Sequence, residues 1–394
     1  LLSPFAATAQ QIALGTEERL YSHVLNEERS LSVYVPEHAG AQQRYPVLYL
    51  LDGESHFLTT AAMVRQLSGV IPDMIVVGIR NTVRGRDLTP THVKPDSTIS
   101  AGDAAISGGG EQFMRFIEKE LIPHIDSLYP AAPYRILSGH SLGGLTVVHT
   151  LIRHTRLFNA YIAIHPSLWW DNQALLKQAQ EALTEKRFGH LSLFVAMANN
   201  MPPGMDTISI LKNTSTMTAV TRSIIPFIKA LRNNPGNGLR WSSRFYPNER
   251  HGTVQLIAQY DALRYLFNYY AFSPTMLSWL HPGGWDEDSA LDAHYRIISE
   301  HLGYTVLPDE SMVNNLGYHC LAGKKLDKAY QLFKRNTDNY PQSANAFDSM
   351  GDYYLAAGDK ARAIASFKKS LQLQETADTR KKLIRLMILR NDIA

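Results

Sequence analysis

The sequence predicts an α/β fold, a mostly parallel doubly wound sheet, followed by an all-helical region. Between residues 17 and 270, short and nearly continuous apolar runs alternate with helical patterns, as buried strands and their covering helices do. Beyond residue 290 the strand-like runs stop and helical patterns follow one another. We therefore expect an N-terminal segment 1–16, an α/β domain 17–272, a linker 273–290 rich in proline, glycine and acidic residues, and a helical domain 291–394.

The strands and helices of the α/β domain are expected in a regular order. Residues 19–25 and 30–36 alternate apolar with polar side chains, as an antiparallel pair does. The later apolar runs read as central parallel strands, and a last strand is expected just before residue 250. The expected central strands are 46–53, 74–79, 134–139, 159–164 and 191–198, and the expected helices are 109–128, 142–154, 172–186 and 218–233.

The helical region contains an internal repeat. Residues 315–318 match residues 349–352, and Phe333 matches Phe367, each pair 34 residues apart. This period, with small residues and an aromatic at these positions, resembles the tetratricopeptide helix–turn–helix, and residues 378–392 are expected to form a closing helix. Two units are fewer than such arrays need alone, so we expect the repeats to brace the α/β domain, to dimerise or to bind a partner protein.

The composition excludes several classes of protein. The net charge of +3 over 394 residues, without a run of Lys or Arg, gives no footprint for nucleic acid. No apolar run approaches the roughly 20 residues that span a bilayer. The single cysteine, Cys320, excludes an internal disulfide. Ala7-Thr8-Ala9 has the form of a signal-peptide cleavage site, which predicts a secreted or periplasmic protein; the other reading is a cytoplasmic protein with a frayed N-terminus.

A nucleophile elbow is expected around Ser141. Residues 139–143, GHSLG, fit G-x-S-x-G, and the motif follows a predicted strand and opens a predicted helix. That turn exposes the serine hydroxyl and places the backbone N–H of Leu142, at the positive end of the helix, beside a developing oxyanion. Ser141 is therefore the expected nucleophile.

The base and the acid are expected later in the chain. His251 lies on a loop after the last expected strand, where an α/β sheet delivers the histidine that activates such a serine. The acid is less clearly marked, because Asn199 and Asn200 directly follow the preceding strand. Asp206 is the expected acid, with Glu249 as the alternative, and a Ser–His dyad stays open.

The remaining expected site residues surround the serine. The loop Asp52-Gly53-Glu54 follows the strand 46–53, so the backbone N–H of Glu54 is the expected second oxyanion donor. Arg80, Arg84 and Arg86 are expected to meet an anionic substrate at the mouth of the pocket, unless salt bridges with Asp87 or a neighbouring carboxylate hold them. No histidine–carboxylate spacing or HExxH motif suggests a metal, and no cofactor is expected. The expected pocket residues are Gly53, His140, Arg86, His165, Trp169 and Trp170.

These motifs resemble those of a known family. The segments LYLLDG, GIRNTVRGRDLTP, GHSLGGL, PSLWWDN and ERHG occur in the order of the putative-esterase family of α/β-hydrolases, which includes enterobactin and salmochelin esterases. The resemblance implies an α/β-hydrolase fold and hydrolysis of a small-molecule carboxylic ester, such as a siderophore ester, through an acyl-serine. By position it supports Ser141, His251 and the backbone of Glu54 and Leu142.

The resemblance leaves two matters open. Members commonly carry a carboxylate near positions 199–201, where this chain has Asn199, Asn200 and Met201, and some siderophore esterases of the family work with a Ser–His dyad. The same machinery would also serve an acyltransferase. A third alternative is a catalytically inert protein that binds a partner through its helical repeats.

Overall fold

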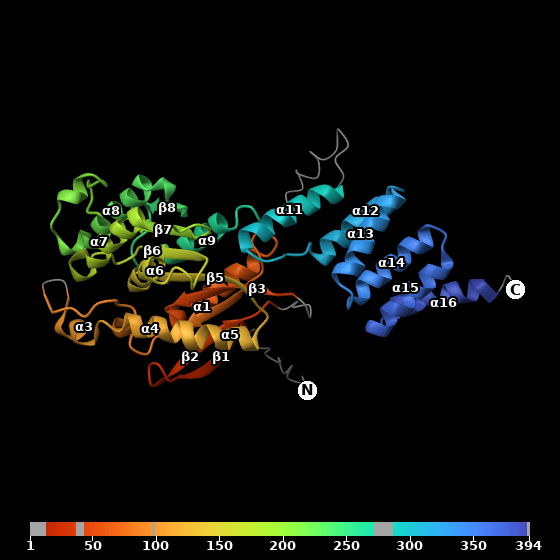
Figure 1. The fold of residues 1–394 in the computed structure, drawn as a ribbon, viewed down its shortest axis with the longest axis horizontal. Coiled ribbons are helices and arrows are strands. Elements are labelled where there is room, and N and C mark those ends of the chain that lie inside the picture. Colours follow the sequence, from red (N-terminus) through yellow and green to blue (C-terminus); the bar gives the residue numbers. More distant parts are fainter. Residues whose placement is uncertain (1–12, 37–42, 97–98, 272–286, 392–394) are drawn as a thin grey trace, which may run out of the picture. The chain divides into compact units, whose positions relative to one another are not determined.

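The structure is a computed structural model that describes residues 13–36, 43–96, 99–271 and 287–391. The chain divides into two compact units, Leu1–Ala271 and Phe272–Ala394 (Figure 1). The predicted signal segment around Ala7–Ala9 and most of the predicted linker 273–290 lie outside the described residues. No helix within the described ranges combines the length and the apolar character needed to cross a membrane.

An eight-stranded sheet forms the centre of the first unit. Its strand order is β1-β2-β4-β3-β5-β6-β7-β8. β1 pairs with β2, and β2 with β4, in antiparallel fashion, whereas every other neighbouring pair is parallel. The strands are β1 Thr16–Ser22, β2 Glu27–Tyr34, β3 Tyr45–Leu51, β4 Ile75–Ile79, β5 Ala131–His140, β6 Ala160–Ile164, β7 Ser192–Ala198 and β8 Arg240–Tyr246.

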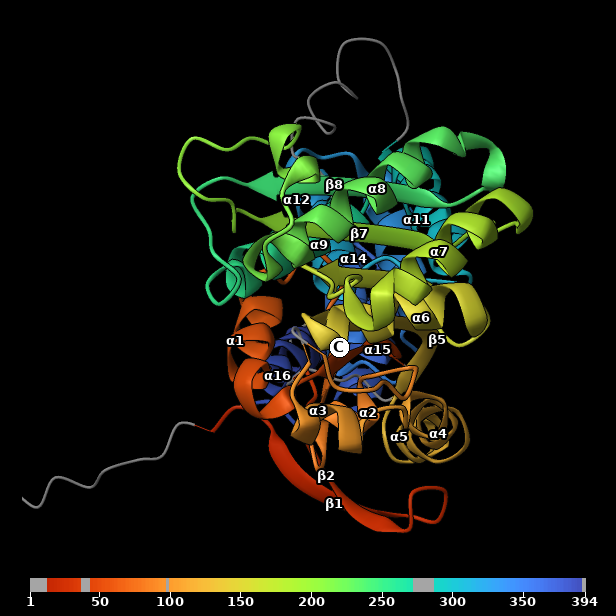
Figure 2. The same ribbon diagram turned by 90° about the vertical axis from the view of Figure 1, so that its left-hand side faces the viewer.

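Helices cover both faces of this sheet (Figure 2). α1 and α9 pack on one face, while α6, α7 and α8 pack on the other. Short 3-10 helices lie at Ser209–Lys212, Thr216–Thr218 and Pro235–Asn237. The α-helices are α1 Gly53–Gln66, α2 Arg84–Asp87, α3 Ala101–Ile106, α4 Gly110–Phe116, α5 Ile122–Leu128, α6 Leu142–Arg153, α7 Trp170–Glu185, α8 Ala219–Asn233 and α9 Val254–Leu266.

The expected helix over 109–128 is interrupted. A π-helical turn, Ile117–Leu121, separates α4 from α5. Pro123 lies two residues after the end of this turn, in the first turn of α5. Proline has no backbone N–H and its ring displaces the carbonyl one turn earlier, so a regular α-helical ladder cannot pass through this point.

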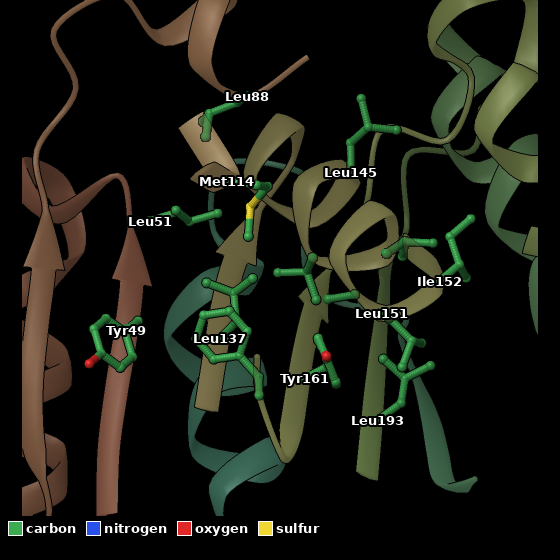
Figure 3. Packing of buried hydrophobic residues seen from close by; sticks show 14 of the residues in the cluster. Tyr49, Leu51, Leu88, Met114, Leu137, Leu145, Leu151, Ile152, Tyr161 and Leu193 are labelled. Atoms are coloured by element: carbon green, nitrogen blue, oxygen red, sulfur yellow. The ribbon is translucent and has the colours of Figure 1, made fainter. Parts of the chain in front are cut away.

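The core lies between the sheet and α6 (Figure 3). Every residue of β3, β4, β6 and β7 is buried, which explains why these strands are nearly continuous apolar runs in the sequence. Leu137 and Tyr161 from the strands lie close to Leu151 from the helix, and none of the three is exposed. This packing fixes α6 against the strand from which it emerges.

The second unit repeats one contact. A Cβ on Gly317 of α12 would lie 2.7 Å from the ring of Phe333 in α13, and one on Gly351 of α14 would lie 2.5 Å from the ring of Phe367 in α15. Two helix pairs therefore pack through the same glycine–phenylalanine contact. The helices are α11 Glu287–Leu302, α12 Glu310–Ala322, α13 Leu326–Asn339, α14 Ala344–Ala356, α15 Lys360–Leu373 and α16 Ala377–Asn391. The expected sheet-and-helix unit followed by a helical region is confirmed.

A buried ionic cluster joins the antiparallel edge of the sheet to α2. Arg29 Nη1 lies 2.5 Å from Asp87 Oδ2, and both side chains are almost completely buried. Arg86 donates from Nε to Asp87 (2.7 Å) and from Nη2 to Glu27 (2.6 Å). The structure thus corrects the expectation that Arg86 lines the substrate pocket, since two carboxylates hold its guanidinium in a structural cluster.

We expect the Arg29→Met variant to lower the free energy of unfolding by about 3 kcal/mol, because Asp87 then keeps a buried charge with one partner fewer. Urea unfolding followed by tryptophan fluorescence measures the change. Arg19→Met is the matched control on the neighbouring strand, since Arg19 and Glu28 form a pair with 77% and 55% of their side chains exposed. That control should lose less than about 1 kcal/mol; equal losses would show that the buried cluster contributes no more than a surface pair.

Candidate active site

Ser141 occupies the turn between β5 and α6. Its backbone has φ 61° and ψ −117°, a conformation that residues other than glycine rarely adopt. The turn is held from both sides, because Ser141 N donates to Ile164 O (3.0 Å) and Ser167 N donates to Ser141 O (3.0 Å). Such strain persists only where its surroundings impose it, and here it places the hydroxyl group at the N-terminus of α6.

The glycines of the motif permit this turn. A Cβ on Gly139 would lie 2.5 Å from the backbone of Gly143, and one on Gly144 would lie 2.9 Å from Pro166 Cα. Real Cβ atoms do not approach backbone this closely, so a larger residue at position 139 would push β5 away from α6, and one at position 144 would push α6 away from the loop after β6. The two glycines therefore occur in the motif because no side chain fits at these positions.

His251 lies after β8, where the sequence analysis placed it. Its backbone N–H donates to Asn200 Oδ1 (2.9 Å). Its ring packs against two other imidazoles, with ring centroids 4.6 Å from His140 and 5.1 Å from His165. Because His140 directly precedes Ser141, the structure brings His251 to the nucleophile elbow, while Ser141 Oγ shares a hydrogen bond with Ser167 Oγ at 3.3 Å.

Four histidines from four different elements gather here. His56 of α1 joins the cluster, with its ring centroid 6.1 Å from that of His140. Burial is the main cause that lowers the pKa of each ring: to about 4 for His140, to about 3 for His165, and below the usual 6.5 for His56 and His251. Nearby positive charge adds to the effect, from Arg84 in the case of His251. The rings are therefore neutral at pH 7.

His165 has a defined neutral form. Its Nδ1 accepts a hydrogen bond from Ala198 N (2.9 Å), so the proton of the neutral ring lies on Nε2. The side chain is completely buried and its ring packs on His251. The expected pocket residue His165 thus lies beneath the expected base. It acts there as a packing surface.

Neither expected acid reaches His251 in the described chain. Asp206 is exposed, and its Oδ1 accepts hydrogen bonds from Ile208 N (3.0 Å), Ser209 N (2.7 Å) and Ser209 Oγ (2.7 Å). These hydrogen bonds lower the pKa of Asp206 and tie it to a 3-10 helix. Glu249 contributes its backbone, which accepts from Asn199 N (2.8 Å). His251 Nδ1 is buried and has no hydrogen-bond partner among the described residues, so the structure does not place Asp206 as the acid.

The two expected oxyanion donors stand at helix N-termini. Leu142 is the first residue of α6 and Glu54 the second of α1, so neither N–H has a carbonyl partner within its own helix. The two helix starts lie side by side, since a Cβ on Gly143 would be 3.4 Å from Asp52 Oδ2. Both helix dipoles therefore direct positive potential toward the space beside Ser141.

A hydrogen-bonded network fixes the start of α1. The buried carboxylate of Asp52 accepts from Arg84 Nε (2.6 Å), Arg84 Nη2 (2.9 Å) and Asn81 Nδ2 (2.7 Å). The carboxylate of Glu54 accepts from Asn81 N (3.1 Å) and Asn81 Nδ2 (2.6 Å). Arg84, one of the arginines expected at the pocket mouth, is thus held by a carboxylate, and no role at the site was expected for Asn81 or His56. The only sequence signal for them was their position just after the strands β3 and β4.

The two expected pocket tryptophans differ in burial and surroundings. Trp170 is buried and lines a cavity of 180 Å³ together with Glu111 and His149, and neither Ser141 nor His251 lines that cavity. Trp169 is half-buried and packs edge-on against Trp170, with ring centroids 6.0 Å apart. The expectation that Trp170 lines the substrate pocket is therefore corrected: Trp170 lines a separate cavity beside α6.

Fold and site together define a class of protein: an α/β-hydrolase with a serine at a strand–turn–helix junction. A family model described as Putative esterase matches residues 22–196. The chain is 35% identical to the ferri-bacillibactin esterase BesA of Bacillus subtilis over 201 residues, which span 46% of this chain and 69% of that relative. The chain belongs to the putative esterase family, whose members are carboxylic ester hydrolases.

Further relatives agree with this assignment. The chain is 31% identical over 151 residues to the siderophore triacetylfusarinine C esterase of Aspergillus fumigatus; the match spans 37% of the chain and about half, 52%, of that relative. A crystal structure of an IroE-like serine hydrolase from Shewanella oneidensis superposes with a TM-score of 0.69 at 30% identity, covering 82% of this chain and 99% of that one.

Proposed function

We propose that the chain hydrolyses siderophore-type esters through an acyl-serine intermediate, with Ser141 as nucleophile and His251 as base. The observation that carries the proposal is the junction at Ser141. A strained serine lies at the N-terminus of α6, and the neutral ring of His251 packs against the adjacent His140. The relatives named as siderophore esterases support the choice of substrate class.

The geometry supports a two-step reaction. Ser141 Oγ attacks the ester carbonyl while His251 accepts its proton, and the N–H groups of Leu142 and Glu54 donate to the oxyanion. His251 then protonates the departing alcohol, which leaves the acyl group on Ser141. Water, deprotonated by the same imidazole, attacks the acyl-serine and releases the acid. An acceptor alcohol in place of water would make the protein an acyltransferase.

The site supports a Ser–His dyad. In a triad, a carboxylate binds the Nδ1–H of the histidine and orients the ring. Here packing between the rings of His140 and His165, and the backbone hydrogen bond to Asn200, orient His251, and no carboxylate of the described residues binds its Nδ1. Burial keeps the ring neutral, which is the form a base requires.

We further propose that α12 to α15 are two units of the tetratricopeptide type. The repeated glycine–phenylalanine contact supports this assignment, because residues 34 apart make it in both helix pairs. The role we propose for these units is to bind a partner protein or a second copy of the chain. The molar mass of the chain with and without residues 287–394, measured by size-exclusion chromatography with light scattering, distinguishes dimerisation from binding of a partner protein.

We expect wild type to be labelled covalently by a fluorophosphonate probe and to hydrolyse catecholate and hydroxamate siderophore esters. Ser141→Ala should lose the label and lower kcat by at least about 10³-fold, because the nucleophile is gone. Intact-mass spectrometry and product chromatography give the two readouts. His251→Ala should lose turnover to a similar extent.

Ser167→Ala is the matched control, since its hydroxyl group lies against Ser141 Oγ but has no role in the proposed steps. It should keep the label and most of the turnover. A folded wild type that takes no label would contradict the proposed enzyme and favour an inert binding protein. Label without hydrolysis of any siderophore ester would contradict the substrate class alone, and an ester product formed with added alcohol would indicate the acyltransferase.

Removing the carboxylates tests the dyad. We expect Asp206→Asn and Glu249→Gln each to lower kcat less than about tenfold, whereas loss of the acid of a working triad costs about 10⁴-fold. Steady-state kinetics on one siderophore ester measure the change. A loss above about 10³-fold in either variant, with the fold retained by circular dichroism, would identify that residue as the acid.

The pH dependence follows from the state of His251. Its pKa lies below 6.5, and only the neutral ring accepts a proton, so the acid limb of kcat/KM should be centred below pH 6.5. Arg84→Met removes a positive charge that lowers this pKa, so the acid limb should move to higher pH. Arg80→Met is the control, because Arg80 pairs with Glu17 at the surface and should leave the limb in place. A wild-type limb centred above pH 7 would contradict this assignment.

A further inference from the structure

Two histidines and a carboxylate meet on the face of the molecule that carries α4 and α6. His149 and His154 come from the C-terminal half and the end of α6, and Glu111 comes from the first turn of α4. His149 Nε2 lies 3.0 Å from Glu111 Oε1, and His154 Nε2 lies 3.1 Å from Glu111 Oε2. One nitrogen or oxygen atom from each of the three residues can be chosen so that all lie within 4.8 Å of one another.

We propose that Glu111, His149 and His154 form a binding site for one divalent transition-metal ion, for which zinc is the best match. Zinc prefers imidazole nitrogen and carboxylate oxygen at about 2.0–2.2 Å in a tetrahedron, which sets neighbouring ligand atoms about 3.3 Å apart. The two imidazole–carboxylate separations of 3.0 and 3.1 Å are a few tenths of an ångström shorter than this spacing, and no two of the three ligand atoms lie more than 4.8 Å apart.

The surroundings leave room for a fourth ligand. Glu111 and His149 line the cavity of 180 Å³ beside α6. Thr91 Oγ1 and Trp170 Nε1 belong to residues that line the same cavity, and both atoms are buried without a hydrogen-bond partner in the described part of the chain. A water or a small anion on the metal would find a hydrogen-bonding group in each of them.

The charge and exposure of the site also suit an ion. His149 is buried, with 6% of its side chain exposed, whereas Glu111 is 56% exposed, so solvent reaches the ligands from one side. Glu111 and Asp171 bring two negative charges to the cavity and Arg153 brings one positive charge. Arg153 donates to Gln178 (2.9 Å), which holds its guanidinium at the cavity wall. A divalent cation therefore enters a site with a net negative lining.

The proposed metal site is separate from the esterase site. His149 lies seven residues along α6 from Leu142, about 10 Å at the rise of an α-helix. The ion would tie α4 to α6, the helix that begins at Ser141. Its expected effect is therefore on the stability of the first unit, and ester hydrolysis does not run through it.

Zinc chloride titrated into the full chain after treatment with a chelator tests the proposal by calorimetry and thermal unfolding. We expect one bound zinc per chain and a rise in Tm. Glu111→Gln and His154→Gln should each weaken binding more than about tenfold, since even residues that only orient a metal ligand contribute about 10- to 100-fold. Both positions are partly exposed, so these variants remain informative if His149→Gln does not fold.

His124→Gln is the matched control. His124 Nε2 also pairs with a carboxylate, Glu18 Oε2 at 3.3 Å, but the metal-binding group found in the described chain does not include it. This variant should bind zinc as wild type does. Absence of saturable binding by wild type would overturn the proposal, as would affinity unchanged in both Glu111→Gln and His154→Gln. Binding lost in His251→Ala instead would place the ion at the histidine cluster of the esterase site, which also overturns it.

Discussion

The left-handed backbone of Ser141 is the constraint on which the rest of the site depends. A chain that leaves a central strand and enters a helix within one residue must bring strand and helix backbones into contact, and at Gly139 that contact leaves no room for a side chain. Gly144 packs as closely against Pro166, in the loop after the neighbouring strand β6. Two backbone hydrogen bonds, to Ile164 and from Ser167, hold the turn against its strain. The backbone of the turn therefore sets the position of the hydroxyl group at the helix N-terminus.

The surroundings of Ser141 combine positive potential with neutral rings. The N-termini of α1 and α6 converge there, and the pairing of Asp52 with Arg84 fixes the first of them while neutralising most of the charge that a free arginine would add. Burial disfavours protonation of the neighbouring imidazoles, so the cluster of His140, His165 and His251 adds no charge of its own at neutral pH. The region is thus suited to stabilise a transient oxyanion and to accept a proton.

α6 links the two sites of the first unit. Its N-terminus lies at the proposed nucleophile, its middle turns are buried against the sheet, and its C-terminal half and the residue that follows it carry the two histidines that meet Glu111. Contacts at either end of α6 act on one rigid helix, because its middle turns are tightly packed against the sheet. The ionic cluster around Arg29 plays the corresponding role at the antiparallel edge, where it joins β2 to α2.

The sequence by itself determined the order of strands and helices, the elbow and the position of His251. These features are local in the sequence. Strands that are buried on both faces consist of apolar runs, and the turn at Ser141 requires glycines close to the serine. The tertiary structure alone decided which charged and polar groups meet. It paired Arg86 with Glu27 and Asp87, left His251 Nδ1 without a carboxylate partner among the described residues, and brought Glu111 to the histidines at the C-terminal end of α6. Such contacts join residues that are far apart in the chain. Which residues meet depends on how the helices pack, and a local sequence pattern does not predict that packing.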